Sequence, residues 1–356
     1  NELSYTCHCS YDLQGNCLQN NSPAGTINYA YNERGCKVKI DSPFWKSTLD
    51  IFDPVGNLLS MTHSDPSGNL KSNFTYDRFD HLTQDKENSY QYDSLGNCLK
   101  KNDQSFQVNN LNQLKATNES EYLYDLNGNL ISQTNPNRTF TYDALNRLKT
   151  IGQTSFSYDA FGRCLTINDP SSKKTLIYQK EQEIGSLING KIHELRVVNP
   201  DASQETTFAI EIDQKSYFPI QDDRFNIIAL RSRNGDILQY SRFSPFGEEV
   251  RFGDTSILNP WRFANRRQIE GLSLYAKRFY NPSIMRWQNP DPLGFEDGLH
   301  LYKYVRNNPF RYFDHDGQFV WMLTLFEVAF GAALEFSFSI TITELNRNYH
   351  SWGSSL

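Results

Sequence analysis

The stretch Tyr92-Asp93-Ser94-Leu95-Gly96-Asn97-Cys98-Leu99 is the clearest copy of a pattern that returns along the first half of the chain. A typical copy has an aromatic residue followed by Asp, then a Gly-Asn or related turn pair, and then an apolar residue. The leading position stands at Tyr76, Tyr92, Val108 in a degenerate copy, Tyr124, Tyr142 and Tyr158, so four steps are 16 residues long and one is 18. Another clear copy leads with Tyr11, and looser copies lead with Tyr31 and Phe52. Chance does not return a four-part pattern at nearly constant spacing, so the sequence is an array of internal repeats.

Each unit has the composition of a β-hairpin. A second aromatic residue stands two positions before the leading one, and residues i and i+2 share one face of a strand. The Asp then falls at a strand end, where its carboxylate can accept nearby backbone N–H groups, and Gly-Asn supplies the positive φ of a tight turn. We therefore predict an all-β fold, a coiled sheet of hairpins with stacked rings on one face. The second aromatics are Phe74, Tyr90, Phe106, Tyr122, Phe140 and Phe156.

The composition agrees with a folded β protein. The chain has 356 residues, of which 38% are hydrophobic and 14% aromatic, which is unlike a disordered chain or a membrane protein. Its net charge of −6 argues against nucleic-acid binding through a general basic surface. Cys17, Cys98 and Cys164 recur at one repeat position, where we interpret them as small apolar fillers. No Cys/His cluster has zinc-finger spacing, and we expect neither a metal nor a cofactor.

The repeat units, over roughly residues 5–170, resemble the YD repeats of bacterial Rhs proteins, of the C subunits of Tc insecticidal toxin complexes and of animal teneurins. The resemblance implies that the repeats coil into a long sheet forming part of a hollow shell. It divides the chain into YD repeats at 1–170, degenerate repeats and a core hairpin at 171–260, an Rhs-associated core at 261–318 and a short apolar tail at 319–356.

The core shows five motifs in the order that this family has. The resemblance implies that the core is a small plug domain with aspartyl autoprotease activity, which cuts the chain after the last motif. Pro and Gly residues around 299–305 also predict a short helical stretch there. The motifs are Arg278-Phe279-Tyr280-Asn281-Pro282, Met285-Arg286-Trp287, Asn289-Pro290-Asp291-Pro292-Leu293-Gly294, the segment 298–309, and Asp314-His315-Asp316-Gly317.

Self-cleavage of this kind requires two carboxylates that share one proton, so that repulsion raises one pKa and the other carboxylate activates water. Asp291 is the first candidate, and Asp314 and Asp316 are the candidates for the second. Either Arg286 or Arg306 is expected to orient a carboxylate.

The bond to be cut would be Gln318–Phe319. His315 and Gln318 depart from the family pattern, which bears on cleavage and not on the fold. The alternative is that Asp291 and Asp314 only cap turns with their side chains. In either case we expect at most a self-cleaving protease, without turnover on external substrates.

The tail is too short to hold an enzyme. We interpret it as a passenger remnant held against the shell, with a membrane-active segment at 319–343 and the start of a longer toxin as alternatives. The chain begins at Asn1 without a visible leader, and we expect a fragment of a longer protein. The expected partners are this tail, an N-terminal shell segment or second shell subunit, and a delivery apparatus. The expected location is secreted or on the cell surface.

Two functions of different classes remain open. The first is encapsulation of the passenger with self-cleavage, and the second is a surface adhesion or carbohydrate-binding module that uses exposed aromatic rings. The orientation of the Tyr90/Tyr92 and Tyr122/Tyr124 rings distinguishes them. Rings packed inside favour encapsulation, and rings facing solvent favour adhesion.

Overall fold

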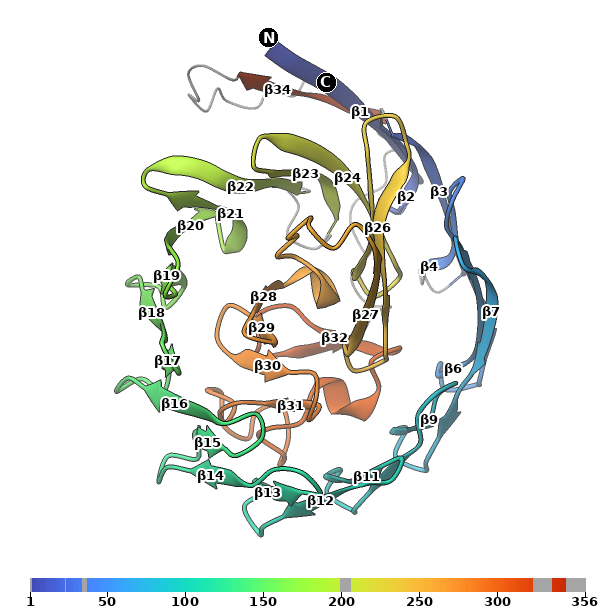
Figure 1. Cartoon of the computed structure of the whole chain (residues 1–356). Coiled ribbons are helices and arrows are strands. Elements are labelled where there is room, and N and C mark those ends of the chain that lie inside the picture. Colours follow the sequence, from blue (N-terminus) through green and yellow to red (C-terminus); the bar gives the residue numbers. More distant parts are fainter. Residues whose placement is uncertain (1, 23, 34–36, 199–205, 323–334, 344–356) are drawn as a thin grey trace.

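The computed structural model describes residues 2–22, 24–33, 37–198, 206–322 and 335–343. A ribbon of antiparallel strands coils around a central segment, drawn in orange in Figure 1, and the predicted all-β fold is confirmed. Strands that follow one another in sequence are neighbours in the sheets. This arrangement follows from the repeat, because each unit supplies one hairpin and short turns join the hairpins.

The ribbon is divided into four sheets. The first holds β34 (Glu335–Thr343), β1 (Glu2–Tyr11), β2 (Cys17–Ser22), β3 (Gly25–Tyr31), β4 (Lys37–Asp41), β5 (Lys46–Phe52), β6 (Leu58–Asp65) and β7 (Gly68–Asn73). The second pairs β8 (Thr75–Tyr76) with β9 (Leu82–Gln84), and the third holds β10 (Tyr90–Tyr92), β11 (Cys98–Lys101), β12 (Gln104–Val108) and β13 (Leu114–Thr117). The fourth holds β14 (Tyr122–Tyr124), β15 (Leu130–Gln133), β16 (Arg138–Tyr142), β17 (Leu148–Ile151), β18 (Thr154–Tyr158), β19 (Cys164–Asn168), β20 (Lys173–Gln179), β21 (Gln182–Ile188), β22 (Lys191–Val198), β23 (Thr207–Ile212), β24 (Lys215–Gln221), β25 (Ile227–Arg231), β26 (Ile237–Phe243) and β27 (Glu249–Gly253).

The central segment is built from short elements. They are a 3-10 turn η1 (Phe263–Asn265), the sheet of β28 (Arg267–Ile269), β29 (Leu272–Leu274), β30 (Phe279–Asn281) and β31 (Arg286–Trp287), a second 3-10 turn η2 (Val305–Asn307), and the pair β32 (Tyr312–Asp314) and β33 (Val320–Met322). The helix predicted at 299–305 is wrong. Tyr302 and Tyr304 insert their side chains into the core, with 2% and 4% exposed, and Lys303 forms a backbone bridge to Arg286, which an α-helix would not allow.

The repeat turns use the predicted chemistry. Asp93 Oδ1 accepts the backbone N–H groups of Leu95 at 2.9 Å and Asn97 at 2.8 Å, and its Oδ2 accepts the Asn97 side chain at 2.9 Å. Gly96 has a φ of 81°, which a residue with a side chain seldom adopts. The same capping recurs in turns that begin at Asp12, Asp53, Asp77, Asn109, Asp125, Asp143, Asp159 and Asp222.

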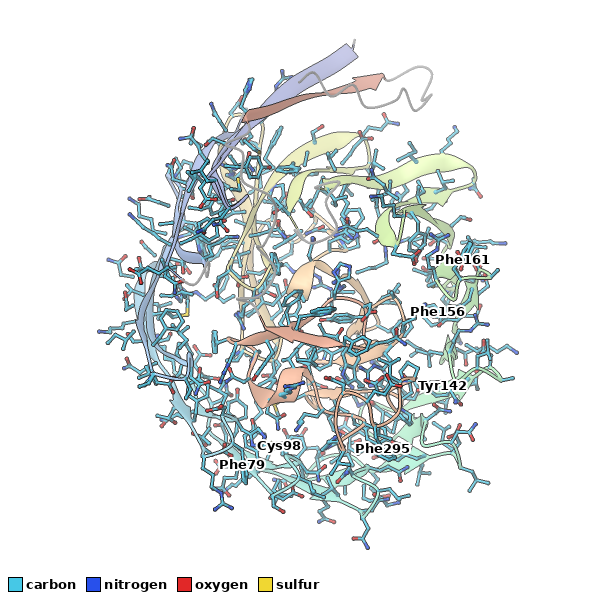
Figure 2. All side chains as sticks on the ribbon, turned by 180° about the vertical axis from the view of Figure 1, so that it is seen from behind. Phe79, Cys98, Tyr142, Phe156, Phe161 and Phe295 are labelled. Atoms are coloured by element: carbon cyan, nitrogen blue, oxygen red, sulfur yellow. The ribbon has the colours of Figure 1, made fainter. Side chains whose placement is uncertain are left out.

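The aromatic rings face the interior, which settles the direction that the sequence left open. Tyr90 and Tyr122 are 3% and 4% exposed, and Tyr92 and Tyr124 pack against the same core while partly buried. Some of the leading tyrosines also join successive units through their hydroxyl groups, as Tyr158 Oη donates to the Leu148 carbonyl at 2.6 Å. In the same units the apolar residues of the turns lie at the rim of the ribbon, such as Phe161, which is 69% exposed (Figure 2).

The end of the ribbon lies against its beginning. Ile220 and Ile228 of strands β24 and β25 pack on Ile27 and Ile40 of strands β3 and β4. Arg242 Nε binds Asp65 Oδ2 at 2.7 Å, which joins β26 to the end of β6. The coil thereby closes around the central segment (Figure 1).

Part of the tail also contacts the ribbon. Strand β34 pairs antiparallel with β1 from Glu2↔Thr343 to Ser10↔Glu335. Residues 323–334 and 344–356 lie outside the described residues, and the first of these ranges falls within the predicted membrane-active segment. Within the ranges that are described, no helix is long and apolar enough to cross a membrane. The four-part division of the chain stays a prediction, and the fourth sheet runs through residue 170 without a break.

Two leucines of one repeat give a matched test of the inward-facing ladder. Leu130 is 1% exposed, whereas Leu126, in the adjoining turn, is fully exposed. We expect Leu130→Ala to lower the free energy of unfolding by about 2–5 kcal/mol and Leu126→Ala to change it by no more than about 0.5 kcal/mol. Urea unfolding of both variants measures this. Similar losses in the two variants would contradict the observed burial.

Candidate active site

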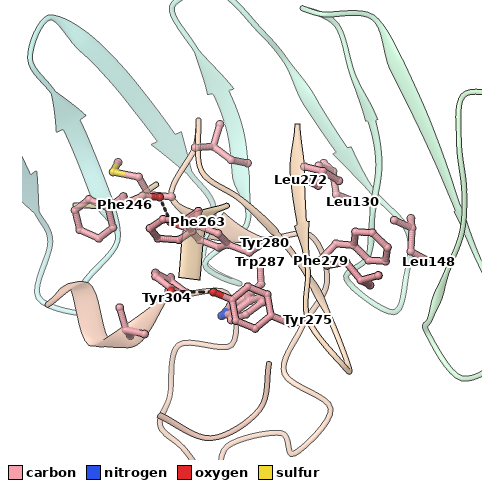
Figure 3. Packing of buried hydrophobic residues seen from close by; sticks show 14 of the residues in the cluster. Leu130, Leu148, Phe246, Phe263, Leu272, Tyr275, Phe279, Tyr280, Trp287 and Tyr304 are labelled. Atoms are coloured by element: carbon pink, nitrogen blue, oxygen red, sulfur yellow. Dashed lines mark hydrogen bonds between the residues drawn. The ribbon is translucent and has the colours of Figure 1, made fainter. Parts of the chain in front are cut away.

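The central segment is held together by stacked aromatic rings. Tyr280 and Tyr304 stack with ring centroids 4.1 Å apart, and Trp287 contacts both rings edge-on. Tyr275 Oη and Tyr304 Oη are 2.9 Å apart, and Tyr280 Oη donates to the Phe246 carbonyl at 2.8 Å (Figure 3). The polar residues of the site stand close to these rings in sequence.

The repeat turns position this segment. In successive turns, the residue with positive φ offers its backbone carbonyl to a side chain of the central segment. Asn307 Nδ2 donates to the Gly96 carbonyl and Tyr302 Oη to the Gly128 carbonyl, both at 2.8 Å. The remaining contacts of this kind are Asn308 to Asp80 at 2.9 Å, Asn289 to Asn146 at 3.2 Å, and Arg286 to Asn112. The backbone carbonyls of the repeat turns therefore position the side chains of the central segment.

Arg278 lies between the two predicted carboxylates. Its Nη2 atom is 2.7 Å from Asp291 Oδ2 and 3.7 Å from Asp314 Oδ2. Its Nε atom donates to the Gly317 carbonyl, and its guanidinium stacks on the Trp287 ring, with Cζ 4.2 Å from the ring centroid. The residue is 3% exposed. Asp291 and Asp314, 23 positions apart in sequence, thus meet around one buried cation.

Each of these two carboxylates uses its other oxygen to cap a turn. Asp291 Oδ1 accepts the Leu293 N–H at 2.9 Å. Asp314 Oδ1 accepts the N–H groups of Gly317 at 2.7 Å and Asp316 at 3.2 Å. Oδ1 of each residue therefore caps a turn, as the turn-capping alternative expects. Oδ2 of each residue faces Arg278.

Asp316 and the predicted cleavage site lie in the short hairpin loop between β32 and β33, where Asp314 pairs with Val320. Asp316 Oδ1 accepts the N–H groups of Gln318 at 3.0 Å and Phe319 at 3.4 Å. Phe319 is 42% exposed, and Gln318 is partly buried. Asp316 thus holds the loop backbone, and Asp314 stands at its base.

Burial dominates the electrostatics of the site. It raises the pKa of Asp314 to about 7; the charge of Asp316 adds to the rise, and Arg278 opposes it. Burial also raises the pKa of Asp291, again opposed by Arg278. Both carboxylates contact the same Arg278 Nη2 atom, and the sharing of one proton between them stays a prediction.

The two arginines that were predicted to orient a carboxylate, Arg286 and Arg306, do not contact Asp291 or Asp314 through any interaction that the structure describes. Arg286 is buried and directs its Nη atoms to the repeat turns, at Asn97 Oδ1 and the Asn112 carbonyl. Arg306 pairs with Asp297 at 3.1 Å, and its side chain is 49% exposed. The arginine that contacts both carboxylates is Arg278. It begins the first motif of the core, but no role was predicted for it. No spacing signal marks it, because its contacts to Asp291 and Asp314 join residues that lie 13 and 36 positions further along the chain.

Within the described ranges, no group of three or more His, Cys, Asp or Glu side chains could hold a metal ion.

His315, which departs from the family pattern, accepts a hydrogen bond from Arg266 Nη2 at 2.6 Å through its backbone carbonyl. Its side chain identity is therefore not required for that contact.

Comparisons with known proteins agree with the repeat architecture. A family model described as Teneurin YD-shell matches residues 1–121, and one described as RHS Repeat matches residues 124–153 and 142–174. The toxin subunit YenC2 of Yersinia entomophaga is 51% identical over 51 residues, which are 14% of this chain and 5% of YenC2. The tRNA nuclease WapA of Bacillus subtilis is 25% identical over an alignment of 272 residues that covers 66% of this chain and 11% of WapA.

Among solved structures, the crystal structure of TcdB2-TccC3 matches with a TM-score of 0.67 at 15% identity. The match covers 87% of this chain and 19% of that one. At this identity the likeness concerns the fold alone. The chain spans only a small part of the length of each of these relatives.

Proposed function

Because the chain belongs to the YD-repeat family, also called RHS-repeat proteins, we propose that it forms part of a β-shell around a C-terminal passenger and cuts its own backbone between Gln318 and Phe319. The observation that carries this proposal is the buried Arg278 between Asp291 and Asp314, next to the hairpin loop that contains the bond. An intramolecular bond held close to a carboxylate needs no separate substrate pocket.

In this proposal four residues have different tasks. Asp314, with a pKa of about 7, is suited to accept a proton from water near neutral pH and to return it to the leaving nitrogen. Asp291 holds Arg278 by charge, and Arg278 binds the Gly317 carbonyl one residue before the bond. Asp316 fixes the loop backbone through the Gln318 and Phe319 N–H groups. In this proposal Asp314 alone transfers the proton, and Arg278 is the cation anchored beside it. The sequence had predicted two carboxylates that share one proton.

Intact-mass spectrometry under denaturing conditions tests the proposal on the chain as made. We expect a species lighter than the full 41.2 kDa by the mass of residues 319–356. Under native conditions we expect the tail to stay bound, since β34 pairs with β1 along nine residue pairs. A single uncut species would mean a structural plug without protease activity.

The pKa of Asp314 predicts how cleavage depends on pH. Because the pKa is raised to about 7, the carboxylate is mostly protonated below that pH and cannot accept a proton from water. The first-order rate of cleavage should therefore rise between about pH 6 and 8 and then level off. Chain recovered uncut in urea from insoluble material and then refolded across this range gives the rate by mass spectrometry. A rate that falls through pH 7 would show that Asp314 acts from its protonated form.

The adhesion alternative has less support. It depends on exposed rings, yet Tyr90 and Tyr122 are packed against the central segment. A shell function also accommodates the partners that toxin relatives suggest, namely a further shell segment or subunit and a delivery apparatus, with secretion of the assembled toxin. A binding assay of the chain on glycan arrays, with no hits expected, separates the two functions.

A further inference from the structure

A small pocket is lined in part by Asp314. Its volume is about 20 Å³, and Arg224, Pro245, Phe263 and Tyr304 contribute to its walls. Asp314 has a fully buried side chain, yet its Oδ2 atom accepts no hydrogen bond from any residue that the structure describes. A buried carboxylate oxygen without a partner is costly, so this pocket calls for a ligand that donates a hydrogen bond.

A second unpartnered atom belongs to another residue that lines this pocket. Arg224 Nε is buried and makes no hydrogen bond to the described part of the chain. Arg224 and Asp314 thus bring an unpartnered donor and an unpartnered acceptor to the walls of one pocket, and a volume of roughly 10–15 Å³ is enough for one water molecule. A single water accepting from Arg224 Nε and donating to Asp314 Oδ2 would satisfy both atoms.

Arg224 also separates this pocket from a much larger one. A cavity of about 380 Å³ lies between β5–β7 and β26–β27, and Arg224 and Pro245 line both spaces. The guanidinium of Arg224 is fixed by a 3.1 Å hydrogen bond from Nη1 to the Pro245 carbonyl and by stacking on Phe310, with Cζ 4.8 Å from the ring centroid. The arginine therefore forms the wall between the cavity and the carboxylate.

We propose that the small pocket binds the hydrolytic water, that Arg224 positions this water through Nε, and that the larger cavity supplies it. The proposal rests on the proposed self-cleavage. The water oxygen bonds to the Gln318 carbonyl carbon while one of its protons passes to Asp314 Oδ2. The bond from that carbon to the Phe319 nitrogen then breaks, and Asp314 returns the proton to the nitrogen. Arg224 is a positioning residue, because it acts on the bond only through the water.

Two substitutions at residue 224 have nearly the same length and differ at the Nε position. Gln places an N–H donor where Arg has Nε, whereas Met places a methyl group there. We expect refolded Arg224→Met to cleave at least tenfold more slowly than the unmutated chain and Arg224→Gln to cleave within about threefold of it. Arg233→Met, at an exposed turn position, is the control and should cleave normally.

Each outcome has a separate meaning. Equal rates for Arg224→Met and the unmutated chain would overturn the role of Arg224, and equal slowing in the Met and Gln variants would reduce it to a packing effect. A crystal structure of uncut Asp291→Asn chain should show water between Asp314 Oδ2 and Arg224 Nε, and an empty pocket would overturn the proposal even if cleavage is real. If the unmutated chain is never cut, the proposed function itself fails, and the water site with it.

Discussion

The Asp291→Asn chain is expected to remain a single uncut species of 41.2 kDa. Asparagine has nearly the same shape but no charge, so it cannot form the 2.7 Å ion pair that holds Arg278. The freed cation would then act on Asp314 alone, lower the pKa of that carboxyl and weaken it as a base. We expect cleavage to slow by two orders of magnitude or more.

The same change at the neighbouring aspartates gives a matched series. Asp314→Asn should also abolish cleavage, because an amide cannot accept the proton of water. Asp316→Asn should still be cut, since an amide oxygen can accept the Gln318 N–H. Its loss of charge removes a contribution that raises the pKa of Asp314, so the rise of the rate with pH should move to lower pH. Intact mass of all three variants, made and refolded in parallel, measures the series.

Cleavage that survives in Asp291→Asn or Asp314→Asn would show that the wrong carboxylates have been assigned. An uncut Asp316→Asn chain with normal stability would move the proton-transferring role to Asp316. Urea unfolding of each variant separates loss of chemistry from loss of folding.

Arg267→Met is expected to lower the free energy of unfolding by about 3–5 kcal/mol. Arg267 is 3% exposed and binds Glu194 Oε2 at 2.7 Å and Glu183 Oε1 at 2.8 Å, which joins β28 to the ribbon. Methionine fills similar space but leaves both buried carboxylates without their main cation. Trp261 would also lose one of the two guanidiniums, those of Arg196 and Arg267, that lie near its ring at 5.0 and 5.2 Å.

The pH dependence of the free energy of unfolding distinguishes this electrostatic effect from a packing effect. Arg267 and Lys174 lower the pKa of Glu194 to about 2, against the opposing effect of burial. In the unmutated chain this carboxylate stabilises the fold above its unfolded pKa of about 4.5, and the contribution is lost as the pH falls toward 2. The difference in the free energy of unfolding between the unmutated chain and Arg267→Met should therefore be largest at neutral pH and decrease in acid.

Arg306→Met provides the matched control. That arginine pairs with Asp297 at 3.1 Å, but its side chain is 49% exposed, so its removal should cost no more than about 1 kcal/mol. Urea unfolding at pH 7 and pH 4 compares the two variants. A loss in Arg267→Met that stays constant with pH would mean that volume and not charge is responsible.

The sequence by itself determined the strands, the turns and the placement of two rings of each unit on one face of the sheet. These features depend on patterns within one unit, namely two rings at i and i+2 and an Asp four positions before Asn, which recur along the repeat array. The capping of Leu95 and Asn97 by Asp93 followed from that local information, whereas the burial of Tyr90 was decided by the closed ribbon. The sequence also located Asp291, Asp314 and the 318–319 bond in one segment by family resemblance.

Only the tertiary structure decided what surrounds these residues. Arg278 takes its place between the carboxylates because strand pairing brings it there, and Arg286 goes instead to a repeat turn 174 residues away in sequence. The pKa of Asp314 depends on complete burial, which no single stretch of sequence specifies. The pocket at Arg224 forms where β24–β25 of the ribbon meet the central segment. Charge pairing and desolvation depend on distances between residues remote in sequence, so they are set only when the ribbon closes.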